Sequence, residues 1–406
     1  MKKVIHILSV IISIAMLSGC AKDNQDEPAR KEPLKREWYR LVKTDTLSCK
    51  KMSDEVLGLT LPLGSTDMVR NTFLYHSTEG SDTLTISGVV CWPLGLERGT
   101  EIWLENHYLS ARWDQCPSQI AQSGMLISYR RNAIYIAADY QGLGLSRELP
   151  HPYLNTILLA KQNIDCFKAA MTFLTDYGPD IADDYKTYNI GYSLGGGAAL
   201  GVARIIELDP ELRELTHLKK TFCGGAPYDQ VAYLNHYLAN TTKKLDYPIA
   251  VLCAIQSIVN SSPSFREKYD YADCFCDKFL NSGILEALDS KSYDSSEINS
   301  MLDKAGCKSI ENILSAGILD KNSQISKDVF YEVSKLDLTS DWTPRIPILI
   351  RQTKNDTYIP FECMESVMKN WGHDNPNVTY QIVSSSHTEE GKNFYMSLFF
   401  GSYSLD

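Results

Sequence analysis

The chain has 406 residues, of which 44% are apolar and 10% aromatic, so it is long enough to build one large core or two smaller ones. Its formal net charge of −10 and its pI of about 5.4 exclude a broad basic surface, so nucleic acid is not an expected partner. Beyond the first 20 residues, no apolar run reaches the roughly 18 residues that a membrane-spanning helix needs.

The N-terminus carries an export signal. Lys2 and Lys3 precede an apolar run over residues 4–17, and the run ends in Leu17-Ser18-Gly19-Cys20. This segment resembles a bacterial lipoprotein signal, which implies removal of residues 1–19 and acylation of Cys20. The alternatives are a plain secretory peptide and an N-terminal anchor helix, for which the apolar run is too short.

Residues 20–37 follow the signal and are dense in charge but poor in apolar side chains. Such a segment cannot bury enough surface to offset the entropy lost on ordering, so it is predicted to be a flexible tether. Its early acidic residues, Asp23, Asp26 and Glu27, are similar to the segments that send some lipoproteins to the outer surface. We therefore expect an exported outer-membrane lipoprotein, facing the periplasm or the cell surface, that contacts the membrane only through Cys20.

Strand-like and helix-like runs alternate over residues 38–406, which are predicted to form one catalytic domain. This alternation favours an α/β fold, with a mostly parallel sheet of about eight strands and helices on both faces. The first two predicted strands form an antiparallel pair. The predicted strands cover residues 72–76, 83–92, 101–106, 133–139, 188–192, 220–226, 346–351 and 378–384.

A long segment, about residues 233–341, separates the sixth predicted strand from the seventh and does not read as sheet. Pro248 stands where a helix begins, and apolar residues then recur at helical spacing from Ile249 to Val259. Further helix-like pieces cover residues 267–280 and 297–314. Because a structureless loop of this length is improbable, the segment is predicted to be a helical cap over the sheet, with a separate small domain as the alternative.

The motif Gly191-Tyr192-Ser193-Leu194-Gly195 fits the pattern G-x-S-x-G. It follows an apolar run that ends at Ile190 and precedes a helix start made of small residues, which is the context of a nucleophile elbow. Ser193 is thus the candidate nucleophile. The backbone N–H of Leu194, at the start of the helix, is the natural first donor to an oxyanion.

A serine nucleophile needs a base and an acid, and in this kind of site the chain order is serine, acid, histidine. Among the histidines after Ser193, only His387 follows a full predicted strand. Asp356 lies in the turn after the preceding strand, whereas Asp341 precedes that strand and so belongs to its wrong end. We therefore predict Ser193, Asp356 and His387 as the catalytic residues.

Three further motifs support a family resemblance: residues 138–144 (Ala-Asp-Tyr-Gln-Gly-Leu-Gly), His151-Pro152-Tyr153 and Gly225-Ala226-Pro227-Tyr228. With the elbow, they resemble the secretory lipase family of the α/β-hydrolases, over roughly residues 87–391. The resemblance implies an exported lipase or esterase whose insert covers the acyl-binding site. Asp139 and Tyr140 are interpreted as structural support for the elbow.

The chain departs from related enzymes after its third predicted strand. Those enzymes often have His-Gly there, whereas this chain has Asn106-His107-Tyr108-Leu109-Ser110. The backbone N–H of His107 or Tyr108 is the expected second oxyanion donor. The His107 side chain either orients the loop or touches the substrate.

The resulting expectation is a serine-dependent carboxylic ester hydrolase, similar to lipases and carboxylesterases, that needs no cofactor and carries no metal site. Its substrate is a small-molecule or glycan-linked ester. The alternatives are a carbohydrate acetyl or feruloyl esterase, a serine peptidase on the same fold, and a non-catalytic binding protein. The predicted apolar walls of the acyl site are Ile249, Leu252, Ile255 and Phe265.

Overall fold

A computed structural model describes residues 35–58 and 66–405 of the chain. The predicted signal peptide over residues 1–19, the lipidated Cys20 and almost all of the predicted tether lie outside the described residues. The residues from Arg36 onward form one compact unit.

The centre of this unit is a nine-stranded sheet with the order β1-β2-β3-β5-β4-β6-β7-β8-β9. The pairs β1–β2, β2–β3 and β3–β5 are antiparallel. The remaining pairs, from β5–β4 to β8–β9, are parallel. The strands are β1 (Tyr39–Leu47), β2 (Met68–Glu79), β3 (Asp82–Pro93), β4 (Arg98–Asn106), β5 (Ile134–Ala138), β6 (Asp180–Tyr192), β7 (Leu218–Gly224), β8 (Ile348–Thr353) and β9 (Val378–Val383).

The mostly parallel sheet confirms the predicted fold class, and the eight predicted strands correspond to β2–β9. The sequence did not predict β1, which forms the edge of the sheet. Most of its side chains are exposed, so it lacks the apolar signal of a buried strand.

Both faces of the sheet are covered by helices. Neighbouring residues along a strand point to opposite faces, so Val89 and Val90 of β3 join different apolar clusters. Val90 packs in a cluster with apolar side chains of α3, α4, α5 and α15 on one face of the sheet. Val89 packs in a cluster with apolar side chains of α1, α2 and α16 on the other face. These helices are α1 (Cys49–Leu57), α2 (Ser123–Arg131), α3 (Thr156–Tyr177), α4 (Leu194–Leu208), α5 (Pro210–Thr216), α15 (Glu362–Trp371) and α16 (His387–Phe399).

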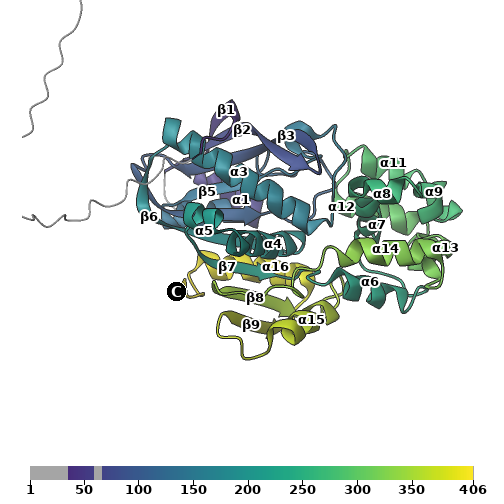
Figure 1. The fold of residues 1–406 in the computed structure, drawn as a ribbon. Coiled ribbons are helices and arrows are strands. Elements are labelled where there is room, and N and C mark those ends of the chain that lie inside the picture. Colours follow the sequence, from purple (N-terminus) through teal and green to yellow (C-terminus); the bar gives the residue numbers. More distant parts are fainter. Residues whose placement is uncertain (1–34, 59–65, 406) are drawn as a thin grey trace, which may run out of the picture. The chain divides into compact units, whose positions relative to one another are not determined.

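The segment between β7 and β8 is helical, as the sequence predicted, and contributes to the first of these clusters (Figure 1). Its main helix begins at Ile249, one residue after Pro248, and the stretch predicted as one helix over residues 267–280 is broken into α9 and α10. Its helices are α6 (Gln230–Leu238), α7 (Ile249–Ser261), α8 (Pro263–Arg266), α9 (Tyr271–Cys274), α10 (Asp277–Leu280), α11 (Ile284–Asp289), α12 (Ser295–Lys304), α13 (Ala316–Leu319) and α14 (Gln324–Ser334).

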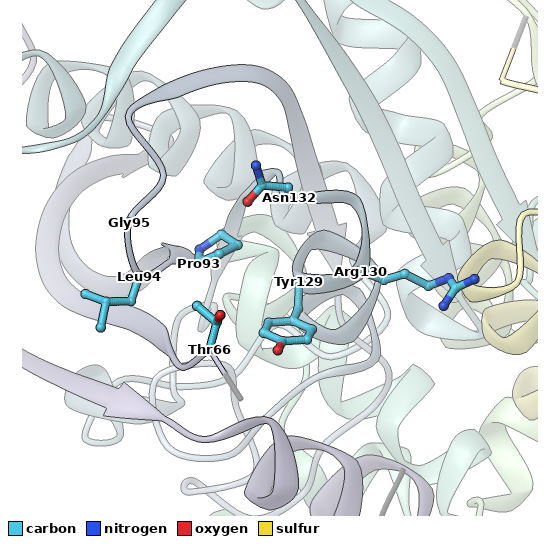
Figure 2. A pocket seen from close by; sticks show the side chains of 7 residues that line it. All are labelled: Thr66, Pro93, Leu94, Gly95, Tyr129, Arg130 and Asn132. Atoms are coloured by element: carbon cyan, nitrogen blue, oxygen red, sulfur yellow. The ribbon is translucent and has the colours of Figure 1, made fainter. Parts of the chain in front are cut away.

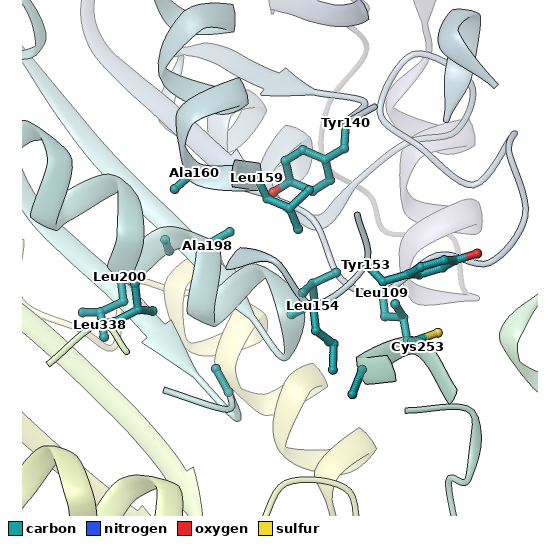
Figure 3. Packing of buried hydrophobic residues seen from close by; sticks show 14 of the residues in the cluster. Leu109, Tyr140, Tyr153, Leu154, Leu159, Ala160, Ala198, Leu200, Cys253 and Leu338 are labelled. Carbon is teal, nitrogen blue, oxygen red and sulfur yellow. The ribbon is translucent and has the colours of Figure 1, made fainter. Parts of the chain in front are cut away.

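The apolar core continues from the sheet into this helical segment. Leu109 and Leu154, from loops of the sheet layer, belong to the same cluster as Cys253 of α7 (Figure 3). All three side chains are buried. The helical segment is therefore packed on the rest of the fold by apolar contacts and does not form a core of its own.

Candidate active site

Ser193 lies in the sharp turn between the end of β6 and the start of α4. Its backbone has φ 59° and ψ −129°, a strained conformation for a residue with a side chain. A Cβ atom on Gly191 would lie 2.1 Å from the carbonyl oxygen of Gly195, and one on Gly195 would lie 2.0 Å from that of Asn106. Both flanking glycines are therefore required by backbone atoms that approach too closely for any side chain.

His387 is the first residue of α16, and its ring faces Ser193. The Nε2 atom lies 3.0 Å from the Ser193 Oγ atom, and the Nδ1 atom lies 2.7 Å from the Oδ2 atom of Asp356. The structure thus places the predicted nucleophile and the predicted acid each within hydrogen-bond distance of the predicted base. This geometry allows Nε2 to take the hydroxyl proton while Nδ1–H donates to the carboxylate.

Asp356 is held in the turn between β8 and α15. Its Oδ1 atom accepts hydrogen bonds from the backbone N–H groups of Tyr358 (2.9 Å) and Ile359 (2.8 Å), and its side chain is fully buried. These bonds leave Oδ2 for the imidazole. The alternative acid, Asp341, lies before β8 begins, and its side chain is 64% exposed. It forms an ion pair with Arg204 and takes no part in this arrangement.

Several neighbours fix the position of His387. The Tyr192 hydroxyl donates to the backbone carbonyl of His387 at 3.0 Å, and the rings of Tyr192 and Tyr358 lie 5.2 Å and 4.8 Å from its imidazole. One turn further along α16, buried Glu390 forms an ion pair with Arg351 of β8. His387 is therefore tied to strands β6 and β8.

The three predicted oxyanion residues occupy two sites beside the elbow. Leu194 is the first residue of α4, so its N–H has no partner within the helix. The loop after β4 runs close to the elbow, since a Cβ atom on Gly195 would lie 2.9 Å from the carbonyl oxygen of His107. Tyr108 follows in the same loop, and its side chain is 42% exposed.

The His107 side chain is buried within its own loop. Its ring nitrogens lie 2.9 Å from the Tyr108 carbonyl oxygen and 3.1 Å from the Asp139 carbonyl oxygen, and its ring stacks on Tyr140 at 4.3 Å. Burial lowers the pKa of His107, so the ring is neutral at physiological pH. These contacts agree with the alternative in which the His107 side chain orients its loop.

Asp139 lies beneath the same loop. Its carboxylate accepts hydrogen bonds from the Ser87 hydroxyl (2.6 Å) and from the Ser118 backbone N–H (2.8 Å). Tyr140 beside it has φ 69° and is fully buried. Both residues hold adjoining loops together, which agrees with a supporting role.

A small cavity of about 20 Å³ adjoins Ser193, which is room for about one water-sized group. The helical segment supplies Tyr233, Tyr247 and Ala250 to its walls, so this segment lies over Ser193. The full set of lining residues is Leu109, Leu154, Ser193, Leu194, Pro227, Tyr233, Tyr247, Ala250, Tyr358 and Ile359.

The prediction that Ile249, Leu252, Ile255 and Phe265 line this cavity is wrong. All four are buried inside the helical segment, where they pack against other apolar side chains. The first seven residues of helix α7 are all apolar, so helical spacing did not reveal that Ala250 is the one that lines the cavity beside Ser193. The tyrosines at positions 247 and 358 carried no sequence signal for this role.

A second hollow lies away from these residues, between the end of β3 and the C-terminal end of α2 (Figure 2). Pro93, Leu94, Tyr129, Arg130 and Asn132 line it. None of the candidate catalytic side chains contributes to it, so it does not belong to the candidate active site.

Two further properties bear on the expectations from sequence. Within the described part of the chain, no three histidine, cysteine, aspartate or glutamate side chains are grouped so that they can hold a metal ion. Over residues 35–58 and 66–405, no helix has the length and apolar character needed to cross a membrane.

Comparison with known proteins identifies the class and then the family. The sheet order, the turn at Ser193 and the helices on both faces are those of the α/β-hydrolases. A model of the secretory lipase family matches residues 132–393, and the chain belongs to this family. Membership implies an exported hydrolase and supports ester hydrolysis as its activity. A search of curated proteins found no match.

Solved structures share this fold at low sequence identity. A putative hydrolase from Legionella pneumophila has a TM-score of 0.72 at 19% identity, with 89% of this chain and 96% of that chain covered. The rice cell wall degrading esterase LipA from Xanthomonas oryzae has a TM-score of 0.68 at 17% identity, covering 89% and 95%. Candida antarctica lipase A has a TM-score of 0.61 at 12% identity, covering 90% and 83%.

Proposed function

We propose that this protein is a carboxylic ester hydrolase that works through an acyl-enzyme on Ser193. The observation that carries the proposal is the continuous hydrogen-bonded chain from the Ser193 hydroxyl through His387 to Asp356. Family membership supports ester hydrolysis independently of this geometry.

The reaction follows from the positions of these groups. As the Ser193 Oγ atom attacks the ester carbonyl carbon, His387 Nε2 takes its proton, and Asp356 holds the proton on Nδ1 and stabilises the imidazolium. The carbonyl oxygen becomes an oxyanion, for which the N–H of Leu194 is the first donor and the N–H of His107 or Tyr108 the second. His387 then protonates the leaving alcohol, and a water molecule releases the acid by the same steps.

The experiment that tests the mechanism combines labelling with hydrolysis. A fluorophosphonate probe is expected to label the wild type and not Ser193→Ala, and Ser193→Ala is expected to lose hydrolysis of p-nitrophenyl acetate. Ser264→Ala, which changes an exposed serine of α8, is the matched control and retains both. A folded wild type without label favours the non-catalytic binding protein instead.

The class of ester is tested in the same preparation. Acetylated xylan, a feruloylated arabinoxylan and a peptide amide are assayed beside p-nitrophenyl esters, because a structural neighbour is a rice cell wall degrading esterase. Ser193-dependent release from a glycan-linked ester places the substrate among carbohydrates, and cleavage of the amide identifies a peptidase.

We also propose that the exported protein is anchored in the outer membrane by lipid on Cys20, facing the periplasm or the cell surface. The signal-like residues 1–20 support this, together with membership of an exported family. Metabolic labelling with a fatty acid is expected to mark the wild type and not Cys20→Ala, followed by fractionation of the two membranes. Label that persists in Cys20→Ala excludes this anchor.

A further inference from the structure

Two tyrosines that line the cavity beside Ser193 stack on each other. Tyr247 comes from the helical segment just before α7, and Tyr358 comes from the turn between β8 and α15. Their rings stack at 4.4 Å with an interplanar angle of 11°. The stack therefore bridges the cap and the sheet layer at the candidate active site.

The two tyrosines differ from the rest of the cavity wall in their exposure. The other wall residues, apart from Ser193 itself, are buried. Tyr247, Tyr358 and Ser193 are each partly exposed. Solvent thus reaches Ser193, while buried apolar side chains such as Leu109 and Leu154 form the inner wall of the cavity.

The size of this cavity limits what can enter it. The cavity of about 20 Å³ has room for a water-sized or methyl-sized group. Each additional methylene of an acyl chain must displace packed side chains, and inserting methylenes into a well-packed region is destabilising. The leaving alcohol is expected to have no such limit, because Ser193 is partly exposed to solvent.

From this geometry we propose that the protein hydrolyses esters of acetyl-sized acids linked to larger alcohols, and that Tyr247 sets this limit by stacking on Tyr358. The proposal rests on the proposed function, since it assumes that Ser193 accepts the acyl group. Tyr247 is the position to vary, because Tyr358 also contacts the His387 ring and its N–H holds Asp356.

The test compares kcat/KM for p-nitrophenyl acetate, butyrate and octanoate in the wild type, in Tyr247→Ala and in Tyr331→Ala. Tyr331 is a matched control, because it is a tyrosine of the same helical segment that is 64% exposed and outside the cavity. The wild type is expected to favour acetate over octanoate at least tenfold. Tyr247→Ala is expected to raise the octanoate-to-acetate ratio by about tenfold or more, and Tyr331→Ala to leave it unchanged.

A wild type that favours octanoate, or a Tyr247→Ala ratio equal to that of the wild type, overturns the proposal. A measurement on the wild type alone avoids dependence on the folding of the variant. Methylphosphonate p-nitrophenyl esters are expected to inactivate Ser193 at least tenfold faster than octylphosphonate esters, and equal rates also overturn the proposal.

The outcomes separate this inference from the proposed function. If no ester is hydrolysed in a Ser193-dependent way, the proposed function itself fails. If hydrolysis depends on Ser193 but does not depend on acyl length, only the acetyl limit fails.

Discussion

The hydroxyl of Tyr192 donates a hydrogen bond to the backbone carbonyl oxygen of His387 at 3.0 Å. Tyr192 directly precedes Ser193, so this bond joins the residue beside the nucleophile to the residue proposed as the base. The Tyr192 ring is also closely packed against helix α16, since a Cβ atom on Gly391 of that helix would lie 3.0 Å from two carbon atoms of the ring.

Replacing Tyr192 by phenylalanine removes this bond and keeps the ring. We expect kcat to fall several-fold with little change in KM, because the imidazole is held less firmly while the cavity wall is unchanged. The loss of the hydrogen bond itself is expected to cost about 1 kcal/mol of stability. Steady-state kinetics and urea unfolding measure the two effects, and an unchanged kcat limits the hydroxyl to a structural role.

The glycine after Leu194 is predicted to be irreplaceable. In Gly195→Ala the new Cβ atom meets the Asn106 carbonyl oxygen at 2.0 Å, so either the elbow or the end of β4 must move. We expect fluorophosphonate labelling to fall by at least about a hundredfold, because the oxyanion donors and the nucleophile are displaced together.

The control for this prediction is Gly80→Ala, at a turn with φ 58° and open space around the Cβ position. It is expected to cost about 1 kcal/mol of stability and to leave labelling unchanged. Labelling of Gly195→Ala at the wild-type rate contradicts the prediction.

Asp356 is expected to matter for rate far more than for folding. In Asp356→Asn the side-chain oxygen can still accept the N–H groups of Tyr358 and Ile359, so the turn is retained. The amide nitrogen then faces His387 Nδ1 and favours the wrong tautomer. We expect kcat to fall on the order of 10⁴-fold with a similar melting temperature. A loss of less than about tenfold argues against Asp356 as the acid.

Buried Glu105 makes a pH-dependent contribution to stability. Burial raises the pKa of this carboxyl to about 7, although it accepts hydrogen bonds from the Tyr135 hydroxyl and the Gly124 N–H. Between the usual glutamate pKa and about 7, the folded chain keeps a proton that the unfolded chain releases. Stability therefore falls as pH rises through this range, by about 3 kcal/mol in total.

Glu105→Gln has no proton to release and keeps the size of the side chain. We expect the stability of Glu105→Gln relative to the wild type to rise from pH 5 to about pH 7 and then to level off toward pH 8, as measured by urea unfolding at each pH. Curves that run parallel to those of the wild type contradict the assignment to Glu105.

Strands with a strong apolar pattern were predictable, and so was the meeting of Ser193, Asp356 and His387. Parallel strands end at one edge of a sheet, so residues that follow β6, β8 and β9 lie near one another whatever their separation in the chain. Their distances agree with that expectation, and their catalytic roles stay predictions.

The walls of the site were not predictable, because they depend on how distant segments pack. Nothing in the sequence pairs Tyr247 with Tyr358, which lie 111 residues apart and meet only when the helical segment folds onto the sheet layer. The edge strand β1 was missed for a related reason. β1 is held in the sheet by its backbone pairing with β2, and its own side chains are mostly exposed.

Strand β7 lies between β6, which leads to Ser193, and β8, which leads to Asp356. After β7 the chain leaves the sheet, and in the described structure it returns at β8 only after the nine helices α6–α14. Substitutions or insertions in that excursion can reshape substrate choice while the strands that hold the reacting groups stay as they are. Selection can thus act on what the protein accepts separately from how it cleaves it.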